Sequence, residues 1–428
     1  MNYQEAMEYL QNLTKFGYNF GLDRIAELLR RFDNPHRKIK TIHVGGTNGK
    51  GSTSAMIHSI LRESGFRAGL YTSPHLHSYT ERFCINGRNI PEQAVADLIA
   101  ELRPQLEDMV KNGFEHPTEF EVGTALGFIY FSREKVDYLV LEVGLGGAID
   151  STNVVIPEVA VITNVAMDHM EYLGNSVREI ARVKAGIIKQ GVPLVTAATG
   201  EALEVILAGS AGLSAPATVV GRDIRWSEIK LVVGGQHLDI HGRKGRYENL
   251  FLPLLGRHQQ VNAATAVATV EVLSDKSSGK ARWAVEEGLA RTVWPARLEV
   301  VQESPTVLID AAHNYDGAVM LRSALDQYFP GRRKVLVLGM LGDKERSKVV
   351  AELAPAAEAV VVTKPNSPRA GDWQMLAMEA RRYVSRVETV ENITGAVRAG
   401  LALAAPGDMV VITGSFYMVA EAREMFIK

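Results

Sequence analysis

Short runs of apolar and β-branched residues alternate with segments of helical periodicity along the first half of the chain. In order, the apolar runs read KIKTIHV, RAGLYT, DYLVLEV, VAVITNV and VPLVTAA, and a helix is expected to begin at Ser52. Strands that alternate with helices indicate βαβ units and a parallel sheet. The first residues, MNYQEAMEYLQNL, predict an amphipathic helix and lack the basic-then-apolar order of a signal peptide.

The pattern changes between about residues 219 and 254, where alternating residues are broken by Gly-Gly and Gly-Arg turns, as in IKLVVGGQHLDIHG. Such a pattern is typical of antiparallel hairpins. A second α/β series follows, with TVLIDAAHN, KVLVLGML, AVVVTKP and DMVVITGS. The Trp294-Pro295 step disfavours a helix at residue 294, so we expect the domain junction there. Residues 1–295, with a β insert at about 219–254, would form one domain and residues 296–428 the other.

Composition narrows the classes of function. The chain has 428 residues, 46% of them apolar, and a formal net charge of -2 without a basic stripe, which argues against nucleic-acid binding. Cys84 is the single cysteine, so the chain has no internal disulfide. No apolar run is long enough for a membrane span. We therefore expect a cytoplasmic protein that acts on small molecules, without nucleic-acid or membrane partners.

The stretch HVGGTNGKGSTSAMI, residues 43–57, predicts a phosphate-binding loop between a strand and a helix. Its glycines allow the backbone N–H groups to turn inward, and Lys50 supplies a positive charge for phosphates. The spacing differs from G-x-x-x-x-G-K-[ST], because Val44 takes the first glycine position and Gly51 separates Lys50 from Ser52. A glycine-rich turn without a ligand is the alternative. The order of strand, turn, lysine and helix favours nucleotide binding.

Several segments in one order resemble the folylpolyglutamate synthase/dihydrofolate synthase family of the Mur ligase superfamily. The resemblance runs nearly end to end, through FGYNFGLDRIAELL, GGTNGKGST, YTSPHLHSYTERFCING, LEVGLGGAIDSTNV, MDHMEYLGNSVREIARVKAGIIKQGVP, LPLLGRHQQVNAATA, WPARLEV, IDAAHNYDGA and ITGSFYMV. It implies an α/β fold with a P-loop-containing, parallel-sheet ATPase domain of the Mur ligase type, a small antiparallel β insert and a Rossmann-like C-terminal glutamate ligase domain. It also implies a monomer that takes part in folate biosynthesis and one-carbon metabolism.

The resemblance implies ATP and Mg²⁺ as cofactors. The magnesium-linked positions would be Ser73, Glu142, at the end of DYLVLEV, and His169, after VAVITNV. A carboxylate, a hydroxyl and a histidine can complete a magnesium site together with phosphate oxygens and water. Taken singly, the glutamate also suits a helix cap or a surface ion pair, and the histidine a hydrogen-bonded loop residue.

Lys184 falls within the apolar stripe of a helix expected from about Ser176, in which Val177, Ile180, Ala181 and Ile188 fall at helical spacing. Burial of an ammonium lowers its pKa toward the neutral amine, to which carbon dioxide can add. The resemblance implies that Lys184 is carbamylated, because the corresponding lysine of the family carries this modification. Alternatively, the methylene groups of Lys184 run along the core and its ammonium pairs with an acidic residue at the surface.

The nucleotide would be bound by Gly49, Lys50, Gly51 and Ser52 and, by resemblance, by Asn262, Arg297 and Asp310. His313, three residues after Asp310, is expected to contact phosphate or the incoming amino acid, or alternatively to cap the following helix.

The resemblance supports folate contacts at Thr118, Phe120, Glu121 and Asp150, with the phenyl ring stacked on a pterin. The family block Gly-Gly-Arg-Leu-Asp here reads Gly-Gly-Ala-Ile-Asp, so Ala148 removes the five N–H donors of an arginine. A milder departure is Tyr315 in place of a proline. We expect TSPHLHSYTERFCING to be a substrate-gating loop; its two histidines, His75 and His77, are the alternative metal pair.

These residues predict an ATP-dependent acid–amino-acid ligase. ATP would phosphorylate the substrate carboxylate, and the α-amine of L-glutamate would displace phosphate to form an amide. The substrate would be a reduced folate and, in a bifunctional enzyme, also dihydropteroate. Lys50, Glu142, His169, Lys184 and His313 are the expected catalytic residues. The alternatives are a Mur-type ligase that acts on a nucleotide-linked sugar and a non-catalytic nucleotide-binding switch.

Overall fold

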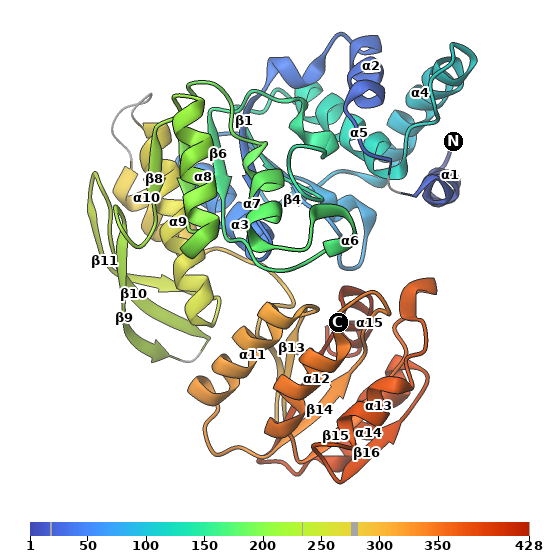
Figure 1. The fold of residues 1–428 in the computed structure, drawn as a ribbon, viewed down its shortest axis with the longest axis vertical. Coiled ribbons are helices and arrows are strands. Elements are labelled where there is room, and N and C mark those ends of the chain that lie inside the picture. The colour runs from blue at the N-terminus through green and yellow to red at the C-terminus, as the bar shows by residue number, and fades with distance from the viewer. Residues whose placement is uncertain (18, 233, 275–280, 428) are drawn as a thin grey trace. The chain divides into compact units, whose positions relative to one another are not determined.

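The computed structural model describes residues 1–17, 19–232, 234–274 and 281–427. It divides into two compact units (Figure 1). Unit 1 comprises residues 1–229, 238–251 and 260–292, and unit 2 comprises residues 230–237, 252–259 and 293–428. In the described ranges, no helix is both long and apolar enough to cross a bilayer.

An eight-stranded sheet lies at the centre of unit 1, in the order β4-β3-β2-β5-β1-β6-β7-β8. Its strands are β1 (Lys40–Gly45), β2 (Ala68–Tyr71), β3 (Phe83–Ile85), β4 (Arg88–Asn89), β5 (Tyr138–Glu142), β6 (Val159–Ile162), β7 (Leu194–Thr196) and β8 (Ala217–Val219). From β2 to β8 all neighbours are parallel, which confirms the predicted sheet. The central strand β1 pairs with β5 on one side and β6 on the other.

The edge strands β3 and β4 differ from the prediction of loops after β2. They pair antiparallel, β3 with β2 and β4 with β3. They are three and two residues long, too short to show an alternating pattern in the sequence.

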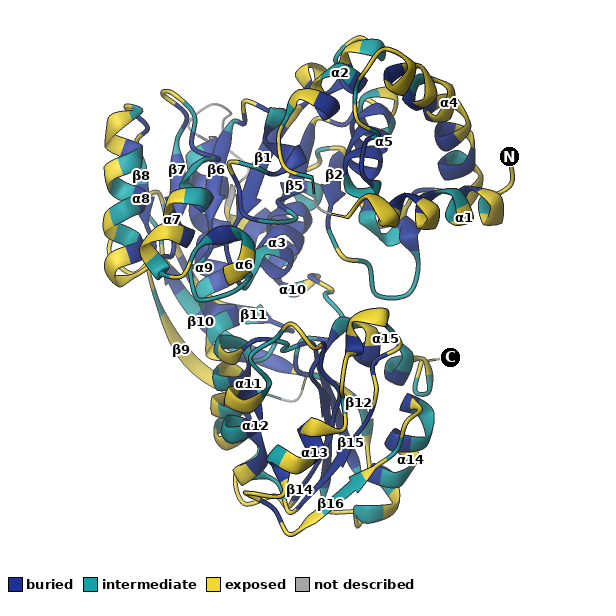
Figure 2. Cartoon of the chain, turned by 45° about the vertical axis from the view of Figure 1, so that its right-hand side comes forward, coloured by how far each residue is buried: buried dark blue, intermediate teal, exposed yellow. Residues whose placement is uncertain are grey.

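Helices cover the strands, which Figure 2 shows as mostly buried. The helices of this part of the chain are α1 (Tyr3–Leu13), α2 (Asp23–Arg31), α3 (Lys50–Glu63), α4 (Glu92–Lys111), α5 (Glu119–Arg133), α6 (Met170–Leu173), α7 (Val177–Ala185), α8 (Gly200–Gly212), α9 (Arg257–Ser274) and α10 (Ala281–Ala290). Residues of α1, α2, α4 and α5 form one core with Leu139 and Leu141 of β5, and residues of α7 and α8 another with Ala160 and Ile162 of β6. Parallel strands covered in this way read as continuous apolar runs.

The predicted antiparallel sheet is confirmed. It has three strands in the order β11-β10-β9, namely β9 (Arg225–Val232), β10 (Gly235–His241) and β11 (Arg246–Leu252). Glu271 of α9 holds the turn between β10 and β11, because its carboxylate accepts from Arg243 N at 2.8 Å and from the Tyr247 hydroxyl at 3.2 Å.

Unit 2 is built on a six-stranded sheet in the order β12-β13-β17-β14-β15-β16, parallel apart from the edge strand β12. Its strands are β12 (Glu299–Glu303), β13 (Thr306–Asp310), β14 (Lys334–Leu338), β15 (Ala359–Val362), β16 (Arg386–Thr389) and β17 (Met409–Thr413). Its helices are α11 (Tyr315–Tyr328), α12 (Arg346–Leu353), α13 (Met375–Ala380), α14 (Ile393–Leu403) and α15 (Phe416–Glu424). The order of alternating strands and helices confirms the Rossmann-like second half.

Candidate active site

The phosphate loop connects β1 to α3. Gly46 and Gly49 have φ angles of +143° and +81°, which favour glycine. A Cβ at Gly46 would lie 2.0 Å from Thr163 Oγ1, and one at Gly49 would lie 2.5 Å from Asn262 Oδ1. The helix begins at Lys50, two residues before the expected start at Ser52. Lys50 and the buried Ser52 therefore belong to the first turn of α3, where N–H groups and the helix dipole favour an anion.

The segment after β6 fixes the loop. Thr47 N donates to Asn164 O at 2.9 Å, and Asn48 N donates to Asn164 Oδ1 at 2.7 Å. The Thr163 hydroxyl donates to Asn48 O at 2.7 Å. The loop conformation is thus set by neighbouring backbone and side chains, and Lys50 Nζ itself donates to Thr47 O at 3.1 Å.

The loops after β1, β2 and β6 and the last residue of β5 lie at one edge of the sheet, because these strands are parallel. Glu142 ends β5, is 4% exposed and accepts a hydrogen bond from Ser73 N at 3.1 Å. His169 precedes α6 with a φ of +48°, an uncommon conformation for a residue with a side chain. Its Nε2 lies 3.8 Å from Asp168 Oδ2.

These residues suit a magnesium ion that is shared with a nucleotide. Within the described ranges, no group of three or more His, Cys, Asp and Glu side chains is arranged to hold a metal ion alone. Mg²⁺ usually takes one or two carboxylates and keeps waters and phosphate oxygens as its other ligands. The buried carboxylate of Glu142 beside Ser73 fits that requirement.

Lys184 is buried at the same edge of the sheet, 4% exposed on α7. Its Nζ donates to Gly46 O, in the phosphate loop, at 2.8 Å. Burial, reinforced by the charge of Lys50, lowers the pKa of Lys184 to about 7, while Asp168 and Asp150 oppose this shift. Burial therefore favours the neutral amine over the ammonium. Ile180 and Ala181 are buried with it as predicted, but α7 ends at Ala185, before Ile188.

Thr118 and Glu121 cap α5. Thr118 precedes the helix, and its hydroxyl and backbone N both donate to Glu121 Oε2, at 2.9 and 2.8 Å. Glu121 is 1% exposed and forms an ion pair with Arg24 at 3.1 Å. Arg24, on α2, is a partner that the sequence did not reveal, because the two residues lie 97 positions apart. The Thr118-to-Glu121 spacing of a capping box was visible in the sequence.

Phe120 lies directly against the loop after β5, since a Cβ at Gly144 would come within 2.4 Å of its ring. Asp150 is buried in the same loop and accepts from Leu145 N at 2.7 Å and from Thr152 N at 3.0 Å. Burial raises the pKa of Asp150. Both carboxylate oxygens thus hold the loop in shape, and Phe120 is placed beside it.

Ala148 stands in this loop with an exposed side chain. Its N donates to Val183 O at 2.9 Å, and a Cβ at Gly186 would lie 2.3 Å from the Ala148 Cβ. The position therefore faces solvent beside the start of the segment after α7, where a longer side chain can extend.

The two histidines of the loop after β2 have different surroundings. Arg82 Nε donates to His75 Nδ1 at 3.0 Å, and burial lowers the pKa of His75 to about 4. His77 N donates to Glu81 Oε1 at 3.0 Å. Because Nδ1 of His75 already accepts a hydrogen bond from the positively charged Arg82, a metal site formed by His75 and His77 is disfavoured.

In unit 2, the predicted residues Arg297 and His313 both lie beside Phe416. The Arg297 guanidinium lies 5.0 Å from the Phe416 ring centroid, and the His313 ring lies 5.6 Å from it. Asp310 ends β13 and accepts from Leu298 N and Ala312 N, each at 2.9 Å. Burial raises the pKa of Asp310, and Arg297 opposes this shift. Phe416, within the ITGSFYMV segment, was not predicted as a site residue.

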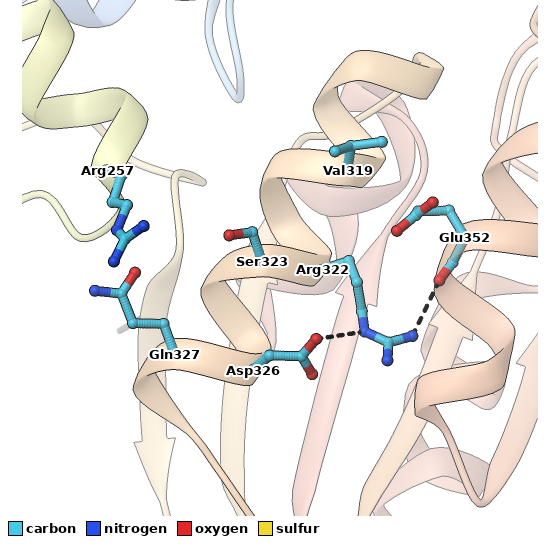
Figure 3. Close-up of a pocket in the computed structure, with 7 residues that line it drawn as sticks. All are labelled: Arg257, Val319, Arg322, Ser323, Asp326, Gln327 and Glu352. Atoms are coloured by element: carbon cyan, nitrogen blue, oxygen red, sulfur yellow. Dashed lines mark hydrogen bonds and ion pairs between the residues drawn. The ribbon is translucent and has the colours of Figure 1, made fainter.

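Unit 2 also has a pocket of about 510 Å³ beside α11 and α12 (Figure 3), lined by Arg257, Val319, Arg322, Ser323, Asp326, Gln327 and Glu352. None of these is a predicted site residue. Arg322 donates to Asp326 at 2.8 Å and to the backbone of Glu352 at 3.3 Å, so its charge is already compensated.

Fold and site together define a P-loop nucleotide-binding α/β protein with a second, Rossmann-like unit. Residues 44–270 match the Mur ligase middle domain, and residues 296–416 match the Mur ligase glutamate ligase domain. The chain is 36% identical to a Bacillus subtilis dihydrofolate synthase/folylpolyglutamate synthase, over 99% of this chain and 98% of the relative.

Solved structures of the same family have a similar fold. Mycobacterium tuberculosis folylpolyglutamate synthase complexed with ADP has a TM-score of 0.93 and 35% identity, covering 100% of this chain and 99% of that one. Escherichia coli FolC in complex with DHPP and ADP has a TM-score of 0.89 and 30% identity, covering 99% and 97%. The chain belongs to the Mur ligase family, in its folylpolyglutamate synthase/dihydrofolate synthase branch.

Proposed function

We propose that this protein is an ATP-dependent ligase that joins the α-amine of L-glutamate to the carboxylate of a folate, and also to that of dihydropteroate. The observation that carries the proposal is that a lysine-bearing phosphate loop, the buried carboxylate of Glu142 and the buried Lys184, whose pKa is lowered, meet at one sheet edge. Relatives that carry both names, and the relative solved with DHPP and ADP, support two pterin substrates.

In unit 1, the loop amides and Lys50 bind the ATP phosphates, with Gly49, Gly51 and Ser52 around them and Asn262 against Gly49. The resemblance to the family also assigns Arg297 and Asp310 to nucleotide binding. Ser73, Glu142 and His169 would hold Mg²⁺, which would supply positive charge to balance the transferred phosphoryl group. Thr118, Phe120, Glu121 and Asp150 form the folate-binding surface.

The reaction has two steps. A substrate carboxylate oxygen attacks the γ-phosphorus, and ADP leaves with the bridging oxygen and its electron pair. The deprotonated glutamate nitrogen then attacks the acyl carbon, and phosphate leaves with the C–O electron pair. Phosphorylation is needed because a carboxylate has no good leaving group, and positioned cations stabilise the charge that develops.

His313 is suited to accept the proton of the glutamate amine. Its Nδ1 lies 3.0 Å from Ala311 O, a carbonyl that can only accept, so Nδ1 carries the hydrogen in the neutral ring. The lone pair is then on Nε2, which can take a proton.

We further propose that Lys184 is carbamylated. Carbon dioxide adds to a neutral amine, and a pKa of about 7 supplies that form at physiological pH. The product is an anion beside Lys50, whose positive charge disfavours the protonated amine and favours the carbamate.

We also propose two domains, a monomeric state and a cytoplasmic location for this protein. The family models that match residues 44–270 and 296–416 support domains at 1–295 and 296–428. The resemblance to the family supports a monomer, and a single buried thiol, Cys84, suits the reducing cytoplasm. Light scattering of the purified chain tests the oligomeric state.

The experiment is glutamate-dependent phosphate release with ATP and magnesium, comparing dihydropteroate with a reduced folate monoglutamate. We expect release with both. Release with the folate alone would restrict the function to a polyglutamate synthase. Release with neither, although ATP binds, would contradict the proposed substrates.

A further inference from the structure

Arg297 is presented by an unusual turn in unit 2. Ala296 and Leu298, on either side of it, have φ angles of +55° and +48° and are 0% and 3% exposed. Left-handed backbone is unfavourable for residues that carry a Cβ, and it persists where neighbouring groups hold it. Two such residues in three positions mean that the direction of Arg297 is set by the contacts of this turn.

The peptide groups of the turn are bonded to specific partners. Ala296 N donates to Glu299 Oε2 at 2.8 Å, and Leu298 N donates to Asp310 Oδ2 at 2.9 Å. Ala296 O accepts from Ala311 N at 3.0 Å and from Arg297 Nη1 at 2.8 Å. The Glu299 carboxylate is therefore one of two side-chain acceptors that fix the turn.

Glu299 is itself held by the C-terminal helix. Arg423 on α15 donates Nε to Glu299 Oε2 and Nη2 to Oε1, both at 2.8 Å, a bidentate pair with side chains only 14% and 27% exposed. Phe416, under the Arg297 guanidinium, begins the same helix seven residues earlier. Seven residues are about two helical turns, so Phe416 and Arg423 lie on one side of α15.

We propose that Glu299 and Arg423 are positioning residues, which hold Arg297 in the direction required to bind the nucleotide. The inference rests on the proposed function, because it needs Arg297 to contact the nucleotide. The helix α15 then fixes Arg297 at two points, with the Phe416 ring beneath the guanidinium and the Arg423–Glu299 pair behind the turn. α15 also packs against β13 and β17, so this support is anchored in the sheet.

The test compares Arg423→Met, Arg423→Lys, Glu299→Gln and Arg297→Ala in the full chain. ADP affinity in the presence of MgCl₂ is measured by isothermal titration calorimetry, and KM for ATP and kcat by phosphate release. We expect Arg423→Met to weaken ADP binding and raise KM about tenfold, with a smaller change in kcat, because a displaced binding group loses affinity. Arg423→Lys should recover part of the affinity, because it keeps the charge but loses the bidentate geometry.

Arg382→Met is the matched control, because it breaks an exposed ion pair to Glu379, 3.0 Å long, in the same unit. It should leave ADP affinity unchanged. A purely structural role of Arg423 would lower the active fraction, and hence kcat, while KM and ADP affinity stayed at wild-type values. If Arg423→Met does not fold, Arg423→Lys and Glu299→Gln decide by the same measurement.

The outcomes separate the two proposals. Weak ADP binding in Arg297→Ala with wild-type binding in the Arg423 and Glu299 variants would overturn the positioning role alone. Wild-type binding in Arg297→Ala would overturn the assignment of Arg297 to the nucleotide, and the positioning role with it.

Discussion

Lys184 shows how burial changes the chemistry of one side chain. The ammonium loses hydration on α7 and faces Lys50, so its pKa falls to about 7. The helical spacing of Lys184 within apolar residues predicted this burial from the sequence. The hydrogen bond from its Nζ to Gly46 O could not be predicted, because it joins residues 138 positions apart.

We predict that Lys184→Ala loses most ligase activity and that added bicarbonate does not restore it. The reason is that the variant has no amine to accept carbon dioxide. NMR with ¹³C-bicarbonate should show a carbamate carbon in the wild type that is absent in the variant. Lys189→Met is the control, since Lys189 is only half-buried and donates to Asn153 O. Full activity in Lys184→Ala would exclude a catalytic role of the carbamate, and a wild-type spectrum without the carbamate carbon would exclude the modification itself.

Ala148→Arg tests one of the two residues at which the chain departs from the family pattern. The Ala148 side chain is exposed, so an arginine can extend without displacing the core. If the guanidinium forms one charge-assisted hydrogen bond with the anionic tail of the substrate, KM for the folate should fall about tenfold. The measurement is steady-state phosphate release at varied folate. Unchanged KM and kcat would show that this position does not contact the substrate.

The candidate folate residues were chosen by resemblance, and their local roles needed the structure. Thr118 and Glu121 cap α5, Glu121 also pairs with Arg24, and Asp150 holds the loop around Leu145. A capping box is visible in sequence, but a partner on another helix is not. Their role as folate contacts therefore stays a prediction, while their local contacts are set by the packing.

At the scale of elements, the glycine-rich loop was predictable because strand, glycines, lysine and helix follow each other in sequence. The longer buried strands were also predictable, because each reads as a continuous apolar run in the sequence. The strands β3, β4, β8, β12 and β16 were not predicted, since they are short edge or near-edge segments with little apolar periodicity. The dense packing of the loop against Thr163 and Asn262 is tertiary and left no local signal.

That packing predicts a specific effect of Gly49→Ala. The added Cβ would lie 2.5 Å from Asn262 Oδ1, so it should displace the amide and weaken ADP binding at least about tenfold. Gly65→Ala is the control: Gly65 has a similar φ of +87°, with nothing within 4 Å of a Cβ. Both variants should lose about 1–2 kcal/mol of stability through left-handed strain. Calorimetric titration that found equal ADP affinity in the two would contradict the steric argument.

At the scale of the whole molecule, buried histidines couple stability to pH. Burial lowers the pKa of His36 to about 4, of His43 to about 3 and of His58 to about 4. Two of these rings have a buried Nδ1 without a hydrogen-bond partner, at His36 and His43. The folded chain buries these imidazoles as neutral groups. Each is therefore protonated only at a lower pH than in the unfolded chain, where a histidine has a pKa near 6.5.

The direction of the pH dependence of stability follows from the difference in bound protons between the unfolded and folded chain. Between about pH 6 and pH 4.5 the unfolded chain carries about three more protons on these histidines than the folded chain, so stability falls as pH falls. These three imidazoles together contribute a loss of about 4 kcal/mol per pH unit, at about 1.4 kcal/mol for each proton. His75 and His258, whose pKa values burial also lowers to about 4, add to this loss. Asp150 and Asp310 oppose it, because burial raises their pKa values and makes the folded chain bind more protons.

Urea unfolding of the full chain at pH 6.5, 5.5 and 4.5 measures this slope. His58→Gln removes one of the three groups, and its amide can still donate to Ala68 O, the present partner of the ring at 3.2 Å. The slope should then fall by about 1.4 kcal/mol per pH unit, whereas the exposed His241→Gln should leave it unchanged. Equal slopes for wild type and His58→Gln would mean that His58 takes up its proton in the folded state, and the buried neutral ring would have to be abandoned.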